Sequence, residues 1–415
     1  MITQHIEQAE KDCQTIFKDV QKVVEYNQRR VLNAFREEQI GDFHFSSSDG
    51  YGYGDSGREG IEAVYANVFG GEDALVRPQI VSGTHAISTT LYSLLKPGDE
   101  LIYMTGRPYD TLEEIIGLRG DNPGSMKDYN IAYNEVDLLE DGSVNFAQLK
   151  SIITDRTKVI GIQRSKGYSD RPSFTITEIK EMVEFVKSIN KELIVFVDNC
   201  YGEFVETEEP LSVGADIIAG SLIKNPGGGL VRAGGYIVGR EDLIEKAANR
   251  LTAPGLGKET GATFNMLQEM YQGFFLAPHI VGEALKGAIF TARLLELLNF
   301  KTSPHYLDKR TDLIQSVTFG NREQMLTFCQ AIQQYSPINS YVQPQPSAMP
   351  GYDDQVIMAG GTFIQGSSIE LSADGPLKEP FITFIQGGLT YEHVKIAISA
   401  AIEQLISEGH NIVDK

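Results

Sequence analysis

The stretch "ADIIAGSLIKNPGGG", residues 215–229, joins a short apolar run to a lysine, Lys224, and then to a proline and three glycines. Short apolar runs bounded by turn residues are typical of buried strands. Similar runs precede it: "PQIVSG" (78–83), "DELIYMT" (99–105), "YNIAYNEVDL" (129–138), "TKVIGIQ" (157–163) and "ELIVFVDN" (192–199). They alternate with stretches of helical spacing, so the sequence predicts an α/β fold with a mainly parallel sheet covered on both faces.

The chain is expected to divide into three segments. Residues 1–45 predict an N-terminal helical arm, because apolar side chains recur at helical spacing from Ile6 to Phe35. Residues 46–280 hold the parallel sheet, and residues 281–415 form a smaller α+β domain. In the last segment the predicted helices are "VGEALKGAIFTARLLELL" (281–298) and "TYEHVKIAISAAIEQLI" (390–406), and the predicted strands are "QVIMAGGTFI" (355–364), "SSIELS" (367–372) and "PFITFIQ" (380–386).

Charge and composition exclude several classes of protein. The 36 Lys and Arg against 56 Asp and Glu give a net charge of −20, which opposes binding to nucleic acid. The N-terminus lacks the layout of a signal peptide, and no apolar run reaches the roughly 18 residues of a membrane span. Cys13, Cys200 and Cys329 form neither a disulfide framework nor a metal-binding pair. We therefore expect a soluble, cytoplasmic protein without a metal.

Ser82, Gly83 and Thr84 follow the run at 78–83 and precede a helical stretch. A glycine at the start of a helix exposes backbone N–H groups, and these form an anion site together with the helix dipole. The three residues therefore predict a place for a phosphate. The alternative is an ordinary N-cap made by a hydroxyl side chain.

Asp198 and Lys224 end two further apolar runs. A buried carboxylate without a partner is costly, so Asp198 needs a cation nearby, and buried lysines are the ones that form Schiff bases. The alternatives are a structural ion pair or helix cap for Asp198 and a lysine that extends to the surface. Parallel strands end at one edge, where pyridoxal 5'-phosphate (PLP) would use the anion site, the carboxylate and the lysine together.

Seven stretches in order along the chain resemble one known family. They are "YGYGDSGREGIE" (51–62), "VSGTHAI" (81–87), "VDNCYGEF" (197–204), "GSLIKNPGGGL" (220–230), "APGLGKETG" (253–261), "YQGFFLAPH" (271–279) and "LSADGP" (371–376). They resemble the fold-type-I PLP enzymes, and within these the group similar to methionine γ-lyase and cystathionine β-lyase that is often labelled aluminium-resistance proteins. The resemblance implies a fold like that of aspartate aminotransferase.

The resemblance implies a role for each cofactor-binding residue. Lys224 would hold the cofactor covalently, and Asp198 would pair with its pyridine nitrogen. The backbone at Gly83 and Thr84, together with the Ser221 hydroxyl, would bind the phosphate, with Ser82 beside them. The three glycines after Lys224 are expected to leave room for the cofactor and for movement of the lysine.

Several aromatic and polar residues have alternative expected roles around the cofactor. Tyr109, in "GRPYDTLEE" (106–114), would stack on the ring and assist proton transfer, or serve only as a wall. His85 would stack on the ring, or else act in capping or packing. Arg164, Ser165 or Tyr201 would face the cofactor's 3'-oxygen, and the sequence does not rank these three.

The resemblance also implies that a neighbouring subunit contributes residues to the site. In the related enzymes a loop from a second subunit brings a tyrosine and an arginine to the phosphate, and Tyr53 and Arg58 occupy the corresponding stretch. The resemblance therefore implies a homo-oligomer, which is at least a dimer and is expected to be a tetramer. The alternative for the tyrosines of this loop is simple packing.

One departure from the family concerns the substrate carboxylate. The related enzymes bind it with an arginine of the C-terminal domain, but this chain has no arginine after Arg322. Lys378, Arg164 and Arg171 are the candidates to replace it.

The expected activity is cleavage of a C–S bond in a sulfur amino acid by β- or γ-elimination, with Lys224 or Tyr109 removing the Cα proton. The residues do not decide between β- and γ-elimination. An aminotransferase or racemase is the alternative within the same fold, and a non-catalytic PLP-binding regulatory protein is the alternative outside enzymes.

Overall fold

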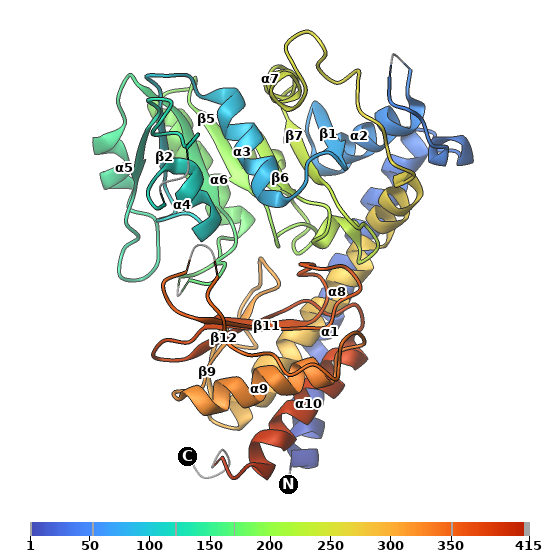
Figure 1. The fold of residues 1–415 in the computed structure, drawn as a ribbon, viewed down its shortest axis with the longest axis vertical. Coiled ribbons are helices and arrows are strands. Elements are labelled where there is room, and N and C mark those ends of the chain that lie inside the picture. Colours follow the sequence, from blue (N-terminus) through green and yellow to red (C-terminus); the bar gives the residue numbers. More distant parts are fainter. Residues whose placement is uncertain (1, 52–53, 121–122, 170, 350–351, 411–415) are drawn as a thin grey trace.

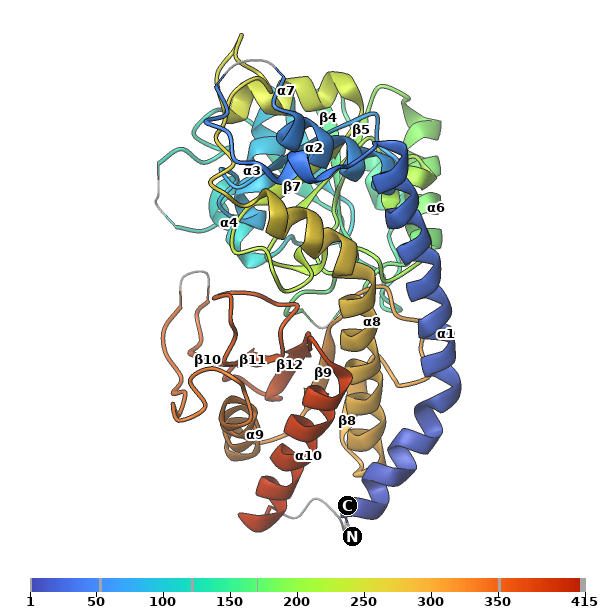
Figure 2. The same cartoon turned by 90° about the vertical axis from the view of Figure 1, so that its right-hand side faces the viewer.

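A computed structural model describes residues 2–51, 54–120, 123–169, 171–349 and 352–410. It has a larger lobe built on a seven-stranded sheet and a smaller lobe built on a five-stranded sheet (Figure 1). Two long helices, α1 (Ile2–Glu37) and α8 (Leu267–Leu297), run side by side along both lobes (Figure 2). The lobes are therefore connected by continuous helices.

The sheet of the larger lobe has the strand order β1-β7-β6-β5-β4-β2-β3. The strands are β1 (Asp73–Arg77), β2 (Glu100–Tyr103), β3 (Ala132–Glu135), β4 (Thr157–Gln163), β5 (Ile194–Asp198), β6 (Ile217–Ser221) and β7 (Gly235–Gly239). The five strands from β6 to β3 are parallel, while β7 runs antiparallel to both of its neighbours. This confirms the predicted α/β fold with a mainly parallel sheet.

Helices cover both faces of this sheet, because successive side chains along each strand point to opposite faces. In β5, Val195 and Val197 join one hydrophobic cluster and Phe196 joins the other. The helices of the lobe are α2 (Ser56–Phe69), α3 (Gly83–Leu94), α4 (Asp110–Ile116), α5 (Phe146–Ile152), α6 (Ile176–Ile189) and α7 (Glu241–Leu251), with 3₁₀ turns η1 (Asp42–Phe45), η2 (Pro210–Val213) and η3 (Asn225–Gly227). Burial on both faces explains why β5 and β6 are almost continuously apolar, whereas the edge strand β3 is only partly buried and carries Asn134 and Glu135.

The smaller lobe is an antiparallel sheet in the order β10-β11-β12-β9-β8 with two helices packed on it. The elements are β8 (Lys301–Ser303), β9 (Gln315–Thr318), α9 (Arg322–Gln334), β10 (Val356–Ala359), β11 (Ser372–Pro376), β12 (Ile382–Gln386) and α10 (Tyr391–Ser407). Ala9 of α1 and Phe290 of α8 also belong to its hydrophobic cluster. The boundary expected after residue 280 falls inside α8, which contributes to the cores of both lobes.

Two predicted strands were placed wrongly. The first strand is Asp73–Arg77 and not "PQIVSG": it ends before Pro78, which has no N–H for a ladder, and Val81 is 73% exposed. In the smaller lobe "SSIELS" is not a strand, since β11 begins only at its last residue, Ser372. The antiparallel strand β7 was not anticipated.

None of the helices in the described part of the chain combines the length and the apolar character needed to span a bilayer.

Candidate active site

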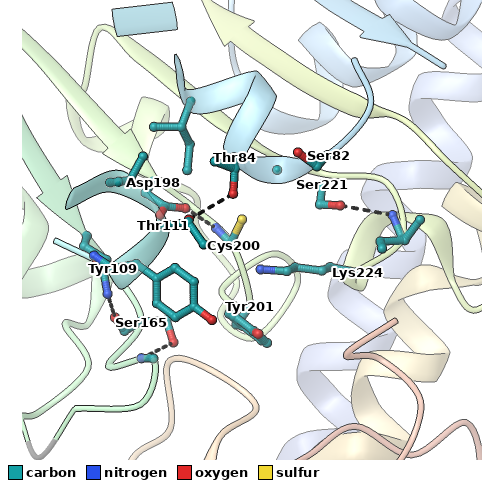
Figure 3. Close-up of a pocket in the computed structure, with 16 residues that line it drawn as sticks. Ser82, Thr84, Tyr109, Thr111, Ser165, Asp198, Cys200, Tyr201, Ser221 and Lys224 are labelled. Carbon is teal, nitrogen blue, oxygen red and sulfur yellow. Dashed lines mark hydrogen bonds between the residues drawn. The ribbon is translucent and has the colours of Figure 1, made fainter. Parts of the chain in front are cut away.

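A cavity of about 270 Å³ opens at the edge of the larger sheet where the parallel strands end. It collects side chains from the ends of β4, β5 and β6 and from the beginnings of α3 and α4 (Figure 3). Of the residues singled out in the sequence, Ser82, Gly83, Thr84, Tyr109, Ser165, Asp198, Tyr201, Ser221 and Lys224 line it. The rule that ligands bind beyond the carboxyl ends of parallel strands therefore located a common site.

The first turn of α3 forms one wall of the cavity. Ser82 is its N-cap, and its Oγ accepts a hydrogen bond of 3.1 Å from the backbone of His85. A Cβ at position 83 would lie 3.2 Å from Ser221 Cβ and 3.4 Å from Cys200 Sγ, so glycine allows this close approach. Ser82 can therefore cap the helix without removing the anion site, because the start of a helix has more free N–H groups than one serine side chain can bind.

His85 takes the capping alternative. Its Nδ1 accepts a hydrogen bond of 3.1 Å from the backbone N–H of Val81, and its side chain is not among those lining the cavity. Burial lowers the pKa of His85, which agrees with a neutral ring accepting this bond. The structure gives no support to the expectation that His85 stacks on the cofactor.

Asp198 ends β5 inside the site and is 6% exposed. Its Oδ1 accepts a hydrogen bond of 3.1 Å from the backbone of Cys200. Burial raises the pKa of Asp198, while Lys224 and the Cys200 amide act in the opposite direction. A carboxylate held in this way gains from a cationic partner such as a protonated ring nitrogen.

Lys224 follows β6 and caps the 3₁₀ turn η3. Figure 3 shows its side chain extending into the cavity above Tyr201, with Nζ 4.0 Å from the centre of the tyrosine ring. Burial by itself lowers the pKa of Lys224, but Cys200, Tyr201 and Asp198 outweigh this and raise it above its ordinary value. The lysine therefore does not extend to the surface.

Tyr201 is held in an unusual backbone conformation. Its φ of 70° lies in the left-handed region, which is uncommon for residues other than glycine. Such conformations persist where the surroundings impose them, and they concentrate at functional sites. Here the conformation keeps the ring beneath the Lys224 ammonium.

Tyr109 stands opposite Lys224 across the cavity (Figure 3). Its backbone N–H donates a hydrogen bond of 2.7 Å to Gln163 Oε1. Burial and Tyr201 raise the pKa of Tyr109 to about 12, although Lys224 acts against this. The phenol is therefore protonated near neutral pH and can donate a proton.

Arg164 and Ser165, the two adjacent candidates for the 3'-oxygen, point in different directions. Ser165 lines the cavity, and its Oγ donates a hydrogen bond of 2.7 Å to Asp312. The Arg164 side chain is 0% exposed and pairs with Glu206 at 3.4 Å and Glu209 at 3.3 Å. Arg164 is therefore a buried structural cation, which does not agree with either role expected for it.

The other expected cations also lie off the cavity wall. Arg171 Nη2 donates to the backbone carbonyls of Gln163 at 3.2 Å and Ser165 at 2.5 Å, so it fixes the loop after β4. Lys378 is exposed. Burial raises the pKa of Asp110, and Lys378 is one of the groups that act against this rise. Within the part of the chain that the structure describes, no arginine lines the cavity.

The loop expected to come from a second subunit is described only in part. Tyr53 lies outside the described residues. Arg58 is 1% exposed, and Nη1 donates a hydrogen bond of 3.1 Å to the carbonyl of Gly50. Its Nε and Nη2 have no hydrogen-bond partner among the residues that the structure describes.

The glycines after Lys224 have a different function from the one expected. A Cβ on Gly227 would lie 1.8 Å from the carbonyl oxygen of Leu222, and one on Gly228 would lie 2.3 Å from that of Gly273 in α8. None of the three glycines lines the cavity. They allow the turn to pack against α8, and this packing holds the backbone that carries Lys224.

Sequence reasoning missed three polar residues of the cavity, namely Thr111, Gln163 and Cys200. Gln163 ends β4 and Cys200 follows β5. The rule that ligands bind beyond the carboxyl ends of parallel strands, if applied to every apolar run, would have identified both as site residues. Thr111 meets Thr84 through a hydroxyl contact of 3.0 Å. That contact joins two helices, and no local pattern signals it.

Comparison with known proteins gives consistent matches. The profile of the family described as methionine gamma-lyase matches residues 2–406. "Uncharacterized protein YnbB" of Bacillus subtilis (strain 168) is 60% identical over 402 residues, which cover 97% of this chain and 96% of that protein. A solved structure of a carbon-sulfur lyase involved in aluminum resistance from Clostridium novyi NT is 50% identical, with a TM-score of 0.93, covering 97% of this chain and 96% of that one.

A more distant structure resembles the chain in fold alone. It comes from Campylobacter jejuni subsp. jejuni NCTC 11168, is 17% identical and has a TM-score of 0.58 over 84% of this chain and 86% of that one. That protein carries a pyridoxyl-lysine monophosphate, the adduct of PLP with a lysine.

Proposed function

The chain belongs to the methionine gamma-lyase family, and from this premise we propose that it is a PLP-dependent lyase that cleaves a C–S bond of a sulfur amino acid. Family and fold imply dependence on PLP. One observation carries the proposal: the start of α3, the Asp198 carboxylate and the Lys224 ammonium meet in one cavity. Few ligands other than PLP need an anion site, a carboxylate and an amine together.

The residues present fit each part of this cofactor. The start of α3 and the Ser221 hydroxyl would bind the phosphate, Asp198 would keep the ring nitrogen protonated, and Lys224 would hold the aldehyde carbon. When bound, PLP supplies an electron sink for the carbanion at the substrate Cα. Ser165 and Tyr201 are the remaining candidates for the 3'-oxygen, because the side chain of Arg164 is fully engaged elsewhere.

The proton chemistry divides between two residues. Lys224 Nζ, once the substrate amine has taken its place on the cofactor, would remove the proton from the substrate Cα. Tyr109 would remain protonated, because its pKa of about 12 is well above neutral. It would therefore donate a proton to the departing sulfur. Lys224 would act as the base because its amine would be released without a charge when the substrate amine replaces it.

Tyr109→Phe tests this division. The ring would keep its place while the hydroxyl is lost, so kcat is expected to fall on the order of a hundredfold, with little change in cofactor absorbance. Steady-state kinetics and the visible spectrum measure both. Tyr26→Phe, on an exposed position of α1, is the control and should leave kcat unchanged. Full activity of Tyr109→Phe would remove the hydroxyl from the mechanism.

For the substrate carboxylate we keep Lys378 as the candidate. Lys378 follows β11 in the smaller lobe, and it acts on the pKa of Asp110, which begins α4 next to the cavity residue Tyr109. A lysine acts on a carboxylate as a point charge and lacks the paired donors of arginine. The substrate would then be oriented mainly by its covalent link through the amine.

The reaction class can be decided by a product assay. The purified protein with PLP is incubated with methionine, cystathionine or cysteine, and the keto acid, the ammonia and the sulfur product (a thiol, or hydrogen sulfide from cysteine) are measured. A lyase releases all three without a second substrate. Keto acid that forms only after an acceptor keto acid is added would identify an aminotransferase, and a yellow protein inactive on a wider amino-acid panel would favour a regulatory role.

A homo-oligomer with shared active sites is part of the proposal. Exposed aromatic residues gather in the segments around Arg58, namely Phe43, Tyr51 and Phe264. Arg58 Nε and Nη2 have no hydrogen-bond partner among the described residues, and the nearest carboxylates, Asp55 and Glu259, are 3.9 and 4.0 Å from the guanidinium. This supports a role for Arg58 toward the phosphate of a neighbouring subunit. Light scattering of the holoenzyme should give the mass of a dimer or a tetramer, and a monomer mass would contradict the shared site.

The cysteines support a cytoplasmic location for this enzyme. Cys13, Cys200 and Cys329 are all buried and free. Unpaired cysteines suit a reducing compartment.

A further inference from the structure

Tyr352 belongs to the smaller lobe, on the segment between α9 and β10. The next residue, Asp353, pairs at 3.6 Å with Arg119, which follows α4 in the larger lobe. The helix α4 begins directly after Tyr109, which lines the cavity of the candidate active site. The chain at Tyr352 and Asp353 therefore contacts the part of the larger lobe that carries Tyr109.

An aromatic cluster connects Tyr352 with Tyr109. Tyr168, on the loop after β4, contacts both, because its ring centre is 6.2 Å from that of Tyr109 and 6.3 Å from that of Tyr352. Phe384 of β12 packs on Tyr168 at a ring-centre distance of 5.2 Å. The Tyr168 hydroxyl donates a hydrogen bond of 3.2 Å to Asp374 of β11. Tyr168 is thus held on the smaller lobe, and its packing fixes where the rings of Tyr109 and Tyr352 lie.

The hydroxyl of Tyr352 is buried close to Tyr109 and Asp110. Burial raises the pKa of both of these groups, and the Tyr352 hydroxyl acts against each rise as a neighbouring hydrogen-bonding group. The contact is not a hydrogen bond of good geometry, since the Tyr352 oxygen has no such partner among the described residues. Catalytic hydrogen bonds are often long or misaligned before the substrate binds.

Tyr352 is the donor in this contact. Burial and the neighbouring Tyr109 and Asp110 raise the pKa of Tyr352, so its hydroxyl keeps its proton near neutral pH. That O–H group would stabilise the phenolate that remains after Tyr109 has given its proton away. A phenolate is more basic than the carboxylate of Asp110, so Tyr109 would attract the Tyr352 proton most strongly at that moment.

We propose that Tyr352 is a positioning residue that makes Tyr109 a better proton donor to the departing sulfur. The O–H bond of Tyr109 breaks and an S–H bond forms on the departing sulfur, while the Tyr352 hydroxyl donates a hydrogen bond to the new phenolate and keeps its own proton. The benefit is confined to leaving groups that need a proton. This inference rests on the proposed lyase function and adds to it a residue of the smaller lobe.

Two leaving groups separate this role from a structural one. The PLP-loaded full-length protein is assayed with the sulfur amino acid that it cleaves fastest and with β-chloroalanine, whose chloride leaves without a proton. Tyr352→Phe should lower kcat for the sulfur amino acid about tenfold and change kcat for β-chloroalanine less than about twofold. Tyr341→Phe, at an exposed tyrosine between α9 and β10, is the matched control and should leave both rates unchanged.

A double mutant shows whether Tyr352 acts through Tyr109. Once Tyr109→Phe has removed the proton donor, adding Tyr352→Phe should slow C–S cleavage less than about twofold further. Tyr352→Phe keeps the ring and its packing on Tyr168, so the variant is expected to fold.

Three results would overturn the inference and leave the lyase function intact: full activity of Tyr352→Phe, an equal loss of kcat for both substrates, or losses that multiply in the double mutant. If the unmodified protein released no sulfur product from any sulfur amino acid, the proposed function would fail and this inference would fail with it.

Discussion

Lys224→Ala should abolish turnover of the sulfur amino acid and the yellow colour of the PLP-loaded protein together. The methyl group of alanine cannot bond covalently to the cofactor, and it cannot take the proton from the substrate Cα. We expect kcat to fall on the order of 10⁴-fold or more, since both the anchor and the base are lost. The visible spectrum and the release of keto acid are the two measurements.

Lys22→Ala is a suitable control for this experiment. Lys22 is an exposed lysine of α1 that pairs with Asp19, so its loss should change neither the colour nor kcat. If the Lys224→Ala protein kept the yellow colour, the cofactor would be attached elsewhere and the proposed site would be wrong. If colour were lost from a protein that never turned over an amino acid, the PLP-binding regulatory alternative would stand.

Asp198→Asn should have the second largest effect. The amide keeps the size of the carboxylate but cannot balance a positive charge on the ring nitrogen, so the cofactor becomes a weaker electron sink. Because the site is buried, water cannot replace the lost charge, and kcat should fall about 100- to 1,000-fold. The cofactor should also dissociate faster on dialysis, which absorbance can follow.

Asp216→Asn is the matched control, because Asp216 is a second buried carboxylate of the same sheet. It precedes β6 and pairs with Lys187 at 2.6 Å and Arg240 at 3.2 Å, away from the cavity. Its replacement should lower the free energy of unfolding without changing the spectrum or kcat of the folded protein. If Asp198→Asn behaved in the same way, Asp198 would be a structural residue only.

The positions of the main site residues could be predicted from the sequence because they follow from topology. Lys224, Asp198 and the turn at Ser82–Thr84 each come just after an apolar run or just before a helix. Parallel strands with helical connections bring such positions to one edge, whatever the details of packing. The same rule, applied to every apolar run, would also have predicted Gln163 and Cys200 as site residues.

The direction of each side chain could not be predicted in this way. Arg164 and Ser165 are adjacent, yet one is buried among Glu206 and Glu209 and the other faces the cavity. The two acidic partners of Arg164 lie more than 40 residues further along the chain, and only tertiary folding brings them to its guanidinium.

The sequence by itself determined the α/β architecture, because the strands are short apolar runs separated by helical stretches. It also determined which apolar runs are followed by a carboxylate, by a lysine or by the start of a helix. Only the tertiary structure decided that "PQIVSG" is not a strand and that Gly227 and Gly228 lie in a turn that packs against α8. The physical reason is that hydrophobic periodicity is a local property, whereas burial, close approach and charge pairing depend on residues distant along the chain.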